Sequence, residues 1–197
     1  MQVDAEGAVA GIVLAAGASS RMGRNKLLLQ LDGESLLRRT VRRAAVARLE
    51  PLLVVLGGDI ERAAAELAEL PCRVIRNPDP GRGQASSLRV GLEALPESVR
   101  AVVVLLADMP RVTEEMIGAL VGRYRESPAK LVVSDYGGVA APPTLYDRAL
   151  FAELCAAEGG GRDVVARHRF EAASLRWPAE ALADLDSPED YARISGE

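Results

Sequence analysis

The sequence predicts one three-layer α/β domain of the Rossmann-like kind, and three observations lead to this prediction. Short apolar runs alternate with segments whose apolar residues recur at helical spacing, which is typical of parallel strands joined by helical crossovers. The apolar runs are nearly continuous, as expected for strands that are buried on both faces. The chain has 197 residues, 49% of them hydrophobic, a size that suits one domain with a sizeable core and no disulfides. Ligands of such a sheet bind at the carboxyl ends of its strands.

The elements follow in chain order. Residues 8–15 are a short apolar run and predict the first strand. Residues 34–48 place Leu37 and Val41 on one side of a helix and Arg38 on the other, so they predict an amphipathic helix. The same two patterns predict strands at 52–56, 72–76 and 101–106 and helices at 60–70, 84–95 and 113–126, the last with Thr113 as its N-cap.

The chain after Lys130 is less regular. Weaker strand patterns at 131–134, 144–146 and 172–176 predict either an antiparallel addition to the sheet or a lid. The sequence contains no repeat and no linker of domain size. We therefore expect residues 1–197 to form a single domain.

Composition excludes several classes of protein. A net charge of -4 gives no general attraction to nucleic acid. Cys72, Cys155 and His168 are too few for a disulfide framework or a four-ligand zinc site. The longest apolar run, 101–107, is far shorter than the roughly 20 residues of a membrane-spanning helix, and residues 1–7 lack the basic start of a signal peptide. We expect a cytoplasmic protein without nucleic-acid or membrane partners.

A glycine-rich loop, residues 14–26, follows the first predicted strand and carries three cations and two hydroxyls. Backbone N–H groups beside small residues approach phosphate oxygens, while Arg21 offers a bidentate fork and Lys26 a compact ammonium. Lys26 stands out because Lys130 is the only other lysine among 24 basic residues. The glycine spacing is not that of a P-loop NTPase. The loop predicts a polyphosphate site, and a plain strand-to-helix connection with solvated arginines is the alternative.

A second glycine loop, residues 77–88, joins a predicted strand to a helix. Its Gly81-x-Gly83-x-x-Ser86 pattern comes close to a dinucleotide fingerprint. The third position is Ser, however, and no clear acidic residue for a ribose follows about 20 residues on. A turn in which Ser86 caps the next helix is the simpler interpretation.

Two further segments contain acidic residues at the ends of predicted elements. Asp108 comes directly after the strongest predicted strand, at the edge of the sheet where carboxylates hold Mg²⁺ or a hydroxyl group, and Pro110 stiffens the turn. Residues 184–191 place two acids before a helix. In each case a helix cap is the alternative, formed by Asp108 for the next helix and by Asp186 or Ser187 for the last one.

Covalent catalysis has little support in the sequence. His168 lies between two arginines in a polar helix, Cys72 lies inside a predicted strand and Cys155 in an apolar helix. What remains is phosphate binding plus carboxylates, which suits a reaction in which the substrate brings its own nucleophile.

Several segments carry motifs of one known family. They are Leu14-Ala-Ala-Gly-Ala-Ser-Ser-Arg-Met-Gly-Arg-Asn-Lys26, Asn77-Pro78, Gly83-Gln-Ala-Ser-Ser-Leu88, Asp108-Met-Pro110, Pro142-Pro143-Thr-Leu-Tyr146 and Asp184-Leu-Asp-Ser-Pro-Glu-Asp-Tyr191. Together they resemble the molybdenum cofactor cytidylyltransferases of the MobA-like NTP transferase superfamily, in order over nearly the whole chain. Ala15-Ala16-Gly17 is more similar to these than to the guanylyltransferases, which usually have Ala-Gly-Gly. Residues 157–162 depart from the family's Gly-Asp-x-Gly-Ala-Arg pattern, on the acceptor side.

The resemblance implies a mixed, mostly parallel sheet of the nucleotide-diphospho-sugar transferase type, with an NTP-binding half at about 1–126 and an acceptor-binding half at about 127–197. It implies transfer of CMP from CTP to a phosphorylated acceptor, molybdopterin or the molybdenum cofactor, with release of pyrophosphate. A phosphate monoester with a second pKa near roughly 6 is already a nucleophile at neutral pH, so no side-chain base is needed. A molybdenum hydroxylase or its chaperone is the implied protein partner.

The resemblance also assigns roles to residues. Catalytic roles fall to Arg21, Lys26 and Asp108, and the implied ligands of Mg²⁺ are Asp108 and Asp186. The implied nucleotide-binding residues are Leu14, Ala15, Ala16, Gly17, Ser19, Gly23, Asn77, Gly83 and Ser87.

The sequence leaves other functions open. An enzyme that uses GTP, or one that acts on a sugar or alcohol phosphate, keeps the same motifs. An NAD-binding oxidoreductase needs a dinucleotide at the loop around Gly81. A non-catalytic nucleotide-binding protein keeps the first loop but dispenses with the acids.

Overall fold

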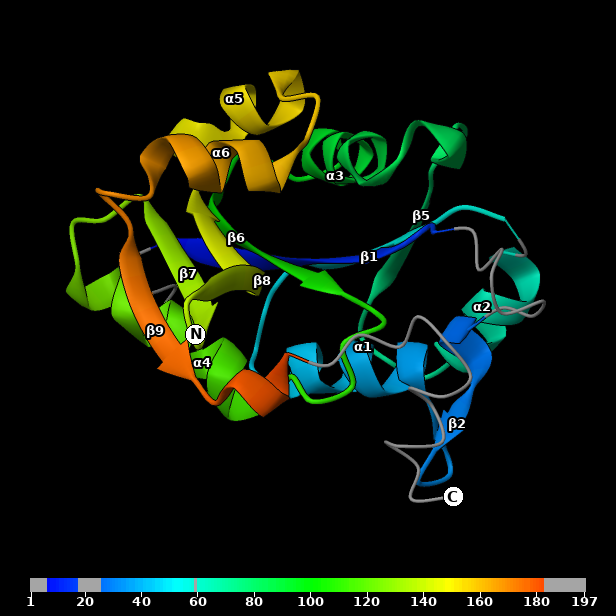
Figure 1. The fold of residues 1–197 in the computed structure, drawn as a ribbon. Coiled ribbons are helices and arrows are strands. Elements are labelled where there is room, and N and C mark those ends of the chain that lie inside the picture. Colours follow the sequence, from blue (N-terminus) through cyan, green and yellow to red (C-terminus); the bar gives the residue numbers. More distant parts are fainter. Residues whose placement is uncertain (1–6, 18–25, 59, 183–197) are drawn as a thin grey trace.

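The structure is a computed structural model that describes residues 7–17, 26–58 and 60–182. Its centre is a seven-stranded sheet in the order β5-β4-β1-β6-β8-β7-β9, with helices on both faces (Figure 1). The predicted α/β domain with a mixed, mostly parallel sheet is confirmed. The strands are β1 (Ala8–Ala15), β4 (Leu52–Leu56), β5 (Arg73–Arg76), β6 (Val99–Leu106), β7 (Leu131–Tyr136), β8 (Val139–Asp147) and β9 (Ala173–Trp177), and the hairpin β2 (Gln30–Leu31) and β3 (Glu34–Ser35) stands apart. The helices are α1 (Leu36–Val46), α2 (Ile60–Glu66), α3 (Gln84–Glu93), α4 (Glu114–Glu126), α5 (Phe151–Ala156) and α6 (Gly161–His168).

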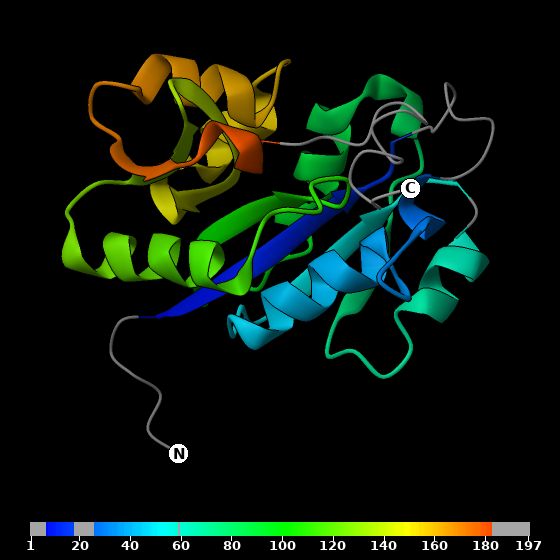
Figure 2. The same cartoon turned by 60° about the horizontal axis from the view of Figure 1, so that its bottom comes forward.

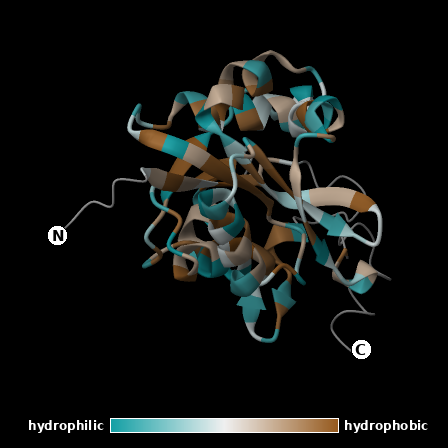
Figure 3. Cartoon of the chain, turned by 90° about the vertical axis from the view of Figure 1, so that its left-hand side faces the viewer, coloured by the Kyte–Doolittle hydropathy of each residue, from teal (hydrophilic) through white to brown (hydrophobic). Residues whose placement is uncertain are grey.

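Side chains of the central strands alternate between two hydrophobic clusters. In β1, Val9 and Val13 belong to the cluster packed against α1, α2 and α4, whereas Ala10 and Ile12 belong to the cluster packed against α3, α5 and α6. Successive side chains of a strand face opposite sides, so a strand covered on both faces needs a continuous apolar run. Figure 2 shows α1 and α4 lying across one face of the sheet, and Figure 3 shows apolar colouring along the strands between the helix layers.

The strand order reverses beside β1. The chain winds from β1 to β4 and β5 on one side, and then returns to place β6 on the other side. Both neighbours of β1 are parallel to it, and Leu14 is paired with Leu106. The carboxyl ends of β1 and β6 therefore meet where the strand order reverses, which is where open α/β sheets bind their ligands.

The first predicted helix is shorter than expected. Residues 34–35 pair with 30–31 in the β2–β3 hairpin, and α1 begins after Ser35, whose hydroxyl oxygen accepts a hydrogen bond of 3.2 Å from the Arg38 N–H. Asp32 and Gly33 both have positive φ, of 53° and 78°. An Asp-Gly pair of this kind is the strongest short-range signal for a two-residue hairpin. The helical spacing of the apolar residues after Glu34 led to the prediction of a helix there, and the hairpin was not predicted.

The other predicted elements are present with shifted ends. The helix predicted at 60–70 ends at Glu66 and the one predicted at 84–95 ends at Glu93. The strand predicted at 72–76 begins at Arg73, so Cys72 lies just before it. Thr113 caps α4 as predicted, because its hydroxyl oxygen accepts from the Met116 N–H. In the part of the chain that the structure describes, no helix has both the length and the apolar character needed to cross a membrane.

The last third of the chain supplies the antiparallel addition. β8 pairs antiparallel with β6 and β7, and β9 pairs parallel with β7. β8 is longer than the predicted strand at 144–146, because it continues through Pro142 and Pro143. Proline donates no N–H to a ladder and is tolerated at irregularities. The pairing register shifts between Val133 and Ser134, and the Ser134 hydroxyl donates to the Pro143 carbonyl over 2.7 Å.

Candidate active site

A pocket with a volume of about 240 Å³ lies where the carboxyl ends of β1 and β6 meet. We call it the first pocket. Four further lining residues were not predicted from the sequence, namely Leu27, Pro80, Gln84 and Leu106. The site residues predicted from the sequence that line it are Leu14, Ala15, Ala16, Gly17, Lys26, Gly83, Ser87 and Asp108.

Lys26 and Asp108 form an ion pair in the first pocket. The Lys26 Nζ lies 2.7 Å from Asp108 Oδ2, and the two side chains are 15% and 23% exposed. A partly buried pair is screened less by salt than a surface pair. Lys26 opens a short 3-10 turn (Lys26–Leu28), and Asp108 stands two residues after β6. The structure thus brings together the lysine that composition singled out and the acid that ends the strongest strand.

Gly57 packs against the end of β1 too closely to carry a side chain. A Cβ added to Gly57 would lie 2.8 Å from the Ala16 carbonyl oxygen and 2.9 Å from Pro80 Cβ. Gly57 follows β4 directly, so its lack of a side chain lets the β4 loop and the second glycine loop both pack against the end of β1. Sequence analysis missed this position, for which the only signal is a Gly-Gly pair after a strand.

The start of α3 faces the pocket through Gly83, Gln84 and Ser87. Gly83 has a φ of 83°, which favours glycine, and it occupies the N-cap position without a side-chain hydrogen bond. Ser86 is therefore not the N-cap. Its hydroxyl donates instead to the carbonyls of Asp79 and Gly83. The N–H groups that open a helix without such a cap suit an anionic ligand, through both hydrogen bonds and the helix dipole.

Asn77 lies behind the first pocket rather than in its lining. It is 2% exposed, and its Nδ2 donates to Ser86 Oγ and Ser87 Oγ, each over 2.9 Å. Its Oδ1 accepts from the Asp79 N–H. The amide of Asn77 therefore joins the end of β5 to the first turn of α3 and positions Ser87, which does line the pocket.

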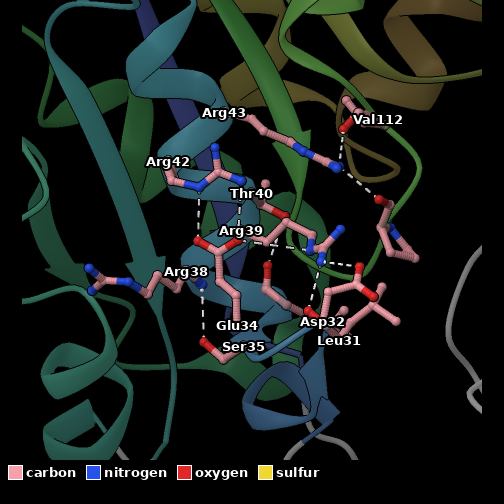
Figure 4. A network of polar contacts seen from close by, with 12 residues as sticks. Leu31, Asp32, Glu34, Ser35, Arg38, Arg39, Thr40, Arg42, Arg43 and Val112 are labelled. Atoms are coloured by element: carbon pink, nitrogen blue, oxygen red, sulfur yellow. Dashed lines mark hydrogen bonds and ion pairs between the residues drawn. The ribbon is translucent and has the colours of Figure 1, made fainter. Parts of the chain in front are cut away.

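The loop that carries Asp108 is fastened to α1 (Figure 4). The half-buried Arg43 guanidinium donates to the carbonyls of Pro110 and Val112, and the Thr40 hydroxyl lies 3.4 Å from the Ala107 carbonyl oxygen. Burial lowers the pKa of Arg43, and the neighbouring arginine charges act in the same direction. Part of the arginine face of α1 is thus used to hold this loop instead of facing solvent.

The donor set of the first pocket fits Mg²⁺ bound together with phosphates. Asp108 offers hard carboxylate oxygens, and Mg²⁺ is commonly held by one or two carboxylates plus substrate phosphates. Within residues 7–17, 26–58 and 60–182, no three His, Cys, Asp or Glu side chains gather as potential metal ligands. Such a site would therefore depend on oxygens of a bound polyphosphate. The implied second ligand, Asp186, lies outside the described residues, as do Ser19, Arg21 and Gly23.

The three residues that the sequence provides little reason to regard as covalent catalysts lie outside the first pocket. His168 Nε2 is 2.7 Å from a Glu153 carboxylate oxygen. Burial raises the pKa of Cys72 and of Cys155, which favours the less reactive thiol form. None of the three lines the first pocket.

A second pocket, with a volume of about 180 Å³, adjoins the first one. The two pockets share Leu14, Gln84 and Leu106 as a common wall. The other side of the second pocket is built by β8 and by the loop that enters α6. A Cβ added to Gly160 would lie 3.2 Å from Ala85 Cα, so this loop packs directly on the start of α3.

The geometry therefore combines a first pocket at the end of β1, which contains the Lys26–Asp108 ion pair, with an adjoining second pocket. A model of the MobA-like NTP transferase domain matches residues 11–173. The chain belongs to the MobA-like NTP transferase family. The match to an NTP transferase domain supports a nucleotidyltransferase.

Two curated relatives and one solved protein illustrate the relationship. Purine catabolism protein PucB of Bacillus subtilis (strain 168) is 30% identical over 196 residues, which cover 92% of this chain and 93% of that protein. A probable molybdenum cofactor guanylyltransferase of Opitutus terrae is 34% identical over 125 residues, 64% of this chain and 60% of that protein. The crystal structure of Rv0371c from Mycobacterium tuberculosis H37Rv covers 97% of this chain and 99% of its own, with a TM-score of 0.85 and 26% identity. A structure of Rv0371c in complex with manganese covers 97% and 99%, with a TM-score of 0.76 and 25% identity.

We expect Asn77→Ala to lower the free energy of unfolding by about 1 to 3 kcal/mol, because it removes a buried amide that bonds three partners. Urea denaturation measures the change. Asp135→Ala is the control, since it removes one exposed hydrogen bond to the Gly138 N–H and should cost at most about 1 kcal/mol. Equal losses in the two variants would contradict a structural role for the buried network.

Proposed function

We propose that this MobA-like NTP transferase moves CMP from CTP to a phosphorylated acceptor, molybdopterin or the molybdenum cofactor, and releases pyrophosphate. The observation that carries the proposal is the pair of adjoining pockets with the Lys26 and Asp108 side chains in the first. One pocket suits a triphosphate donor, and the other is placed to receive the group that attacks it. The molybdenum cofactor guanylyltransferase relative supports an acceptor of the molybdopterin type.

In the proposed reaction, an oxygen of the acceptor phosphate forms a bond to the α-phosphorus of CTP. The bond from the α-phosphorus to the bridging oxygen breaks, and pyrophosphate leaves with the electron pair. The acceptor phosphate is already an anion at neutral pH, so no base is needed. Lys26 stabilises the charge that builds on the leaving pyrophosphate, and the N–H groups at the start of α3 orient phosphate oxygens. By family resemblance, Arg21 assists Lys26.

Asp108 is the proposed ligand for Mg²⁺, with Asp186 as its second carboxylate. When it is bound, Mg²⁺ neutralises charge on the phosphates. The manganese complex of Rv0371c supports a divalent cation in this family. Asp108 then holds the triphosphate through the cation, and Lys26 contacts it directly.

The choice of base is proposed from the motif after β1 and from the relatives. Ala15-Ala16-Gly17 favours a pyrimidine nucleotide by resemblance. The guanylyltransferase relative favours GTP. An oxidoreductase or a non-catalytic nucleotide-binding protein would release no pyrophosphate. The release of pyrophosphate from a mixture of CTP, Mg²⁺ and a pterin acceptor therefore tests the class of reaction.

We expect Asp108→Asn to lower the transfer rate at least tenfold, which is about 1.4 kcal/mol of barrier, because an amide is a poor ligand for Mg²⁺ and a poor partner for Lys26. The substitution keeps the shape of the side chain, so the melting temperature should stay close to wild type. Asp32→Asn, on an exposed turn outside the lining of the first pocket, is the matched control for turnover. A variant at position 108 with more than a tenth of the wild-type rate argues against the metal role.

Lys26→Arg should lower kcat by at least about fivefold, which is about 1 kcal/mol of barrier, although it keeps the charge. A planar guanidinium is larger than an ammonium and would hold the Asp108 carboxylate through two bonds instead of one. The control is Lys130→Arg, at the only other lysine, which is exposed and lies outside the first pocket. The two variants are compared at saturating CTP and Mg²⁺. Wild-type turnover in Lys26→Arg would make Lys26 an ordinary charged residue.

The specificity constant should be higher for CTP than for GTP with the same acceptor. Competition between the two nucleotides in one reaction measures the ratio of the constants directly. A ratio of one or below would overturn the cytidylyl assignment and leave the nucleotidyltransferase proposal standing.

A further inference from the structure

Helix α1 is bonded to both segments that carry the charged pair of the first pocket. At its start, the Leu36 N–H donates to the Leu29 carbonyl over 3.1 Å, and the Leu29 N–H donates to the Lys26 carbonyl over the same distance. Further along the helix, the Arg43 guanidinium bonds the loop after β6, which carries Asp108. The helix therefore connects the backbone of Lys26 to the loop of Asp108.

The contacts of α1 with this loop lie on both sides of Asp108. Thr40 and Arg43 are three residues apart, so they lie on the same face of the helix. The Thr40 hydroxyl is 3.4 Å from the Ala107 carbonyl oxygen, one residue before Asp108. The Arg43 guanidinium donates to the Pro110 carbonyl over 2.7 Å, two residues after Asp108. A shift of the backbone at Asp108 therefore strains hydrogen bonds on both sides of it.

Arg43 makes its bonds from inside the protein. Its side chain is 15% exposed, and its Nη1 donates to the carbonyls of both Pro110 and Val112. Its Nε lies 3.9 Å from a Glu114 carboxylate oxygen, at the first residue of α4. Arg43 does not line the first pocket, so it acts on that site through the loop.

Arg38, on the same helix, makes the same kind of bonds to a different segment. Its Nη1 donates to the Glu66 carbonyl over 2.8 Å and to the Ala68 carbonyl over 3.1 Å, at and just after the end of α2. Neither of these carbonyls belongs to a residue that lines the first pocket. Figure 4 shows the guanidinium groups of Arg38 and Arg43 pointing in opposite directions. The two arginines thus have equivalent bonds, but only Arg43 bonds the loop of Asp108.

We infer that Arg43 is a positioning residue for the transfer reaction, because through the backbone of the loop it sets where the Asp108 carboxylate lies. This inference rests on the proposed function, since it takes Asp108 as the ligand of Mg²⁺. A carboxylate that binds a metal needs groups behind it that fix its position, and the loss of such groups weakens metal binding. Lys26 is held through separate backbone bonds, so its contact with phosphate should persist when Arg43 is replaced.

The test separates metal-dependent from metal-free nucleotide binding. Isothermal titration measures the dissociation constant of CTP, or of GTP if GTP binds more tightly, once with a chelator and once with Mn²⁺. The ratio of the first constant to the second is the metal contribution. We expect Arg43→Met to lower the metal contribution at least about fivefold and to leave the metal-free constant within about twofold of wild type. A purely structural role would change both constants.

Arg38→Met is the matched control. It also removes two bonds to backbone carbonyls, so its urea midpoint should fall by about as much as that of Arg43→Met. Its metal contribution should nevertheless stay within about twofold of wild type. Arg43→Lys keeps the charge and replaces the planar guanidinium, so its metal contribution should lie between those of Arg43→Met and wild type. It allows the same comparison if Arg43→Met is too unstable.

Asp108→Asn distinguishes failure of the inference from failure of the proposed function. It should remove most of the metal contribution, because it replaces the proposed ligand. A wild-type metal contribution in Asp108→Asn would show that the proposed metal role of Asp108 is wrong. Loss of the metal contribution in Asp108→Asn but not in the Arg43 variants overturns the inference alone. Equal losses in Arg38→Met and Arg43→Met overturn it as well.

Discussion

The reversal of strand order at β1 is the constraint on which the site depends. β1 is paired on both edges and covered on both faces, so its residues must be small or apolar until the strand ends. Polar chemistry can begin only at its carboxyl end, where β6 ends as well. The close approach of Gly57 to Ala16 continues this packing into the loop. Residues 14–17 therefore line the first pocket in a place that the core fixes.

The charged side chains of the first pocket are supported by hydrogen bonds made further inside the protein. Lys26 and Asp108 face each other in the first pocket, and the loop of Asp108 is held from behind by the Arg43 guanidinium. Asn77 plays the corresponding part for the start of α3. Both supports are buried or half-buried and act on backbone or hydroxyl groups. The side chains that would meet a substrate therefore sit on loops whose positions are fixed by hydrogen bonds further inside.

The parts predicted well from the sequence are those governed by local patterns. Continuous apolar runs located the central strands, and the residues at their carboxyl ends converged on one pocket because parallel topology forces them to. The β2–β3 hairpin was missed because the helical spacing after Glu34 hid an Asp-Gly turn. The role of Asn77 could not be predicted from its motif. An asparagine that positions other residues and an asparagine that contacts a ligand look the same in a sequence. Ion pairs such as that of Lys26 depend on contacts distant along the chain.

The two pockets are lined mainly by different parts of the chain. The first pocket is lined by residues between 14 and 108, whereas the second adds residues between 140 and 165. The common wall comes from β1 and β6, two neighbouring strands in the middle of the sheet, and from the first residue of α3. Substitutions in β8 or in the loop before α6 can therefore change the second pocket without moving Lys26 or Asp108. A fold built in this way can keep the first pocket while the second diverges, and the departure from the Gly-Asp-x-Gly-Ala-Arg pattern falls in residues that line the second pocket.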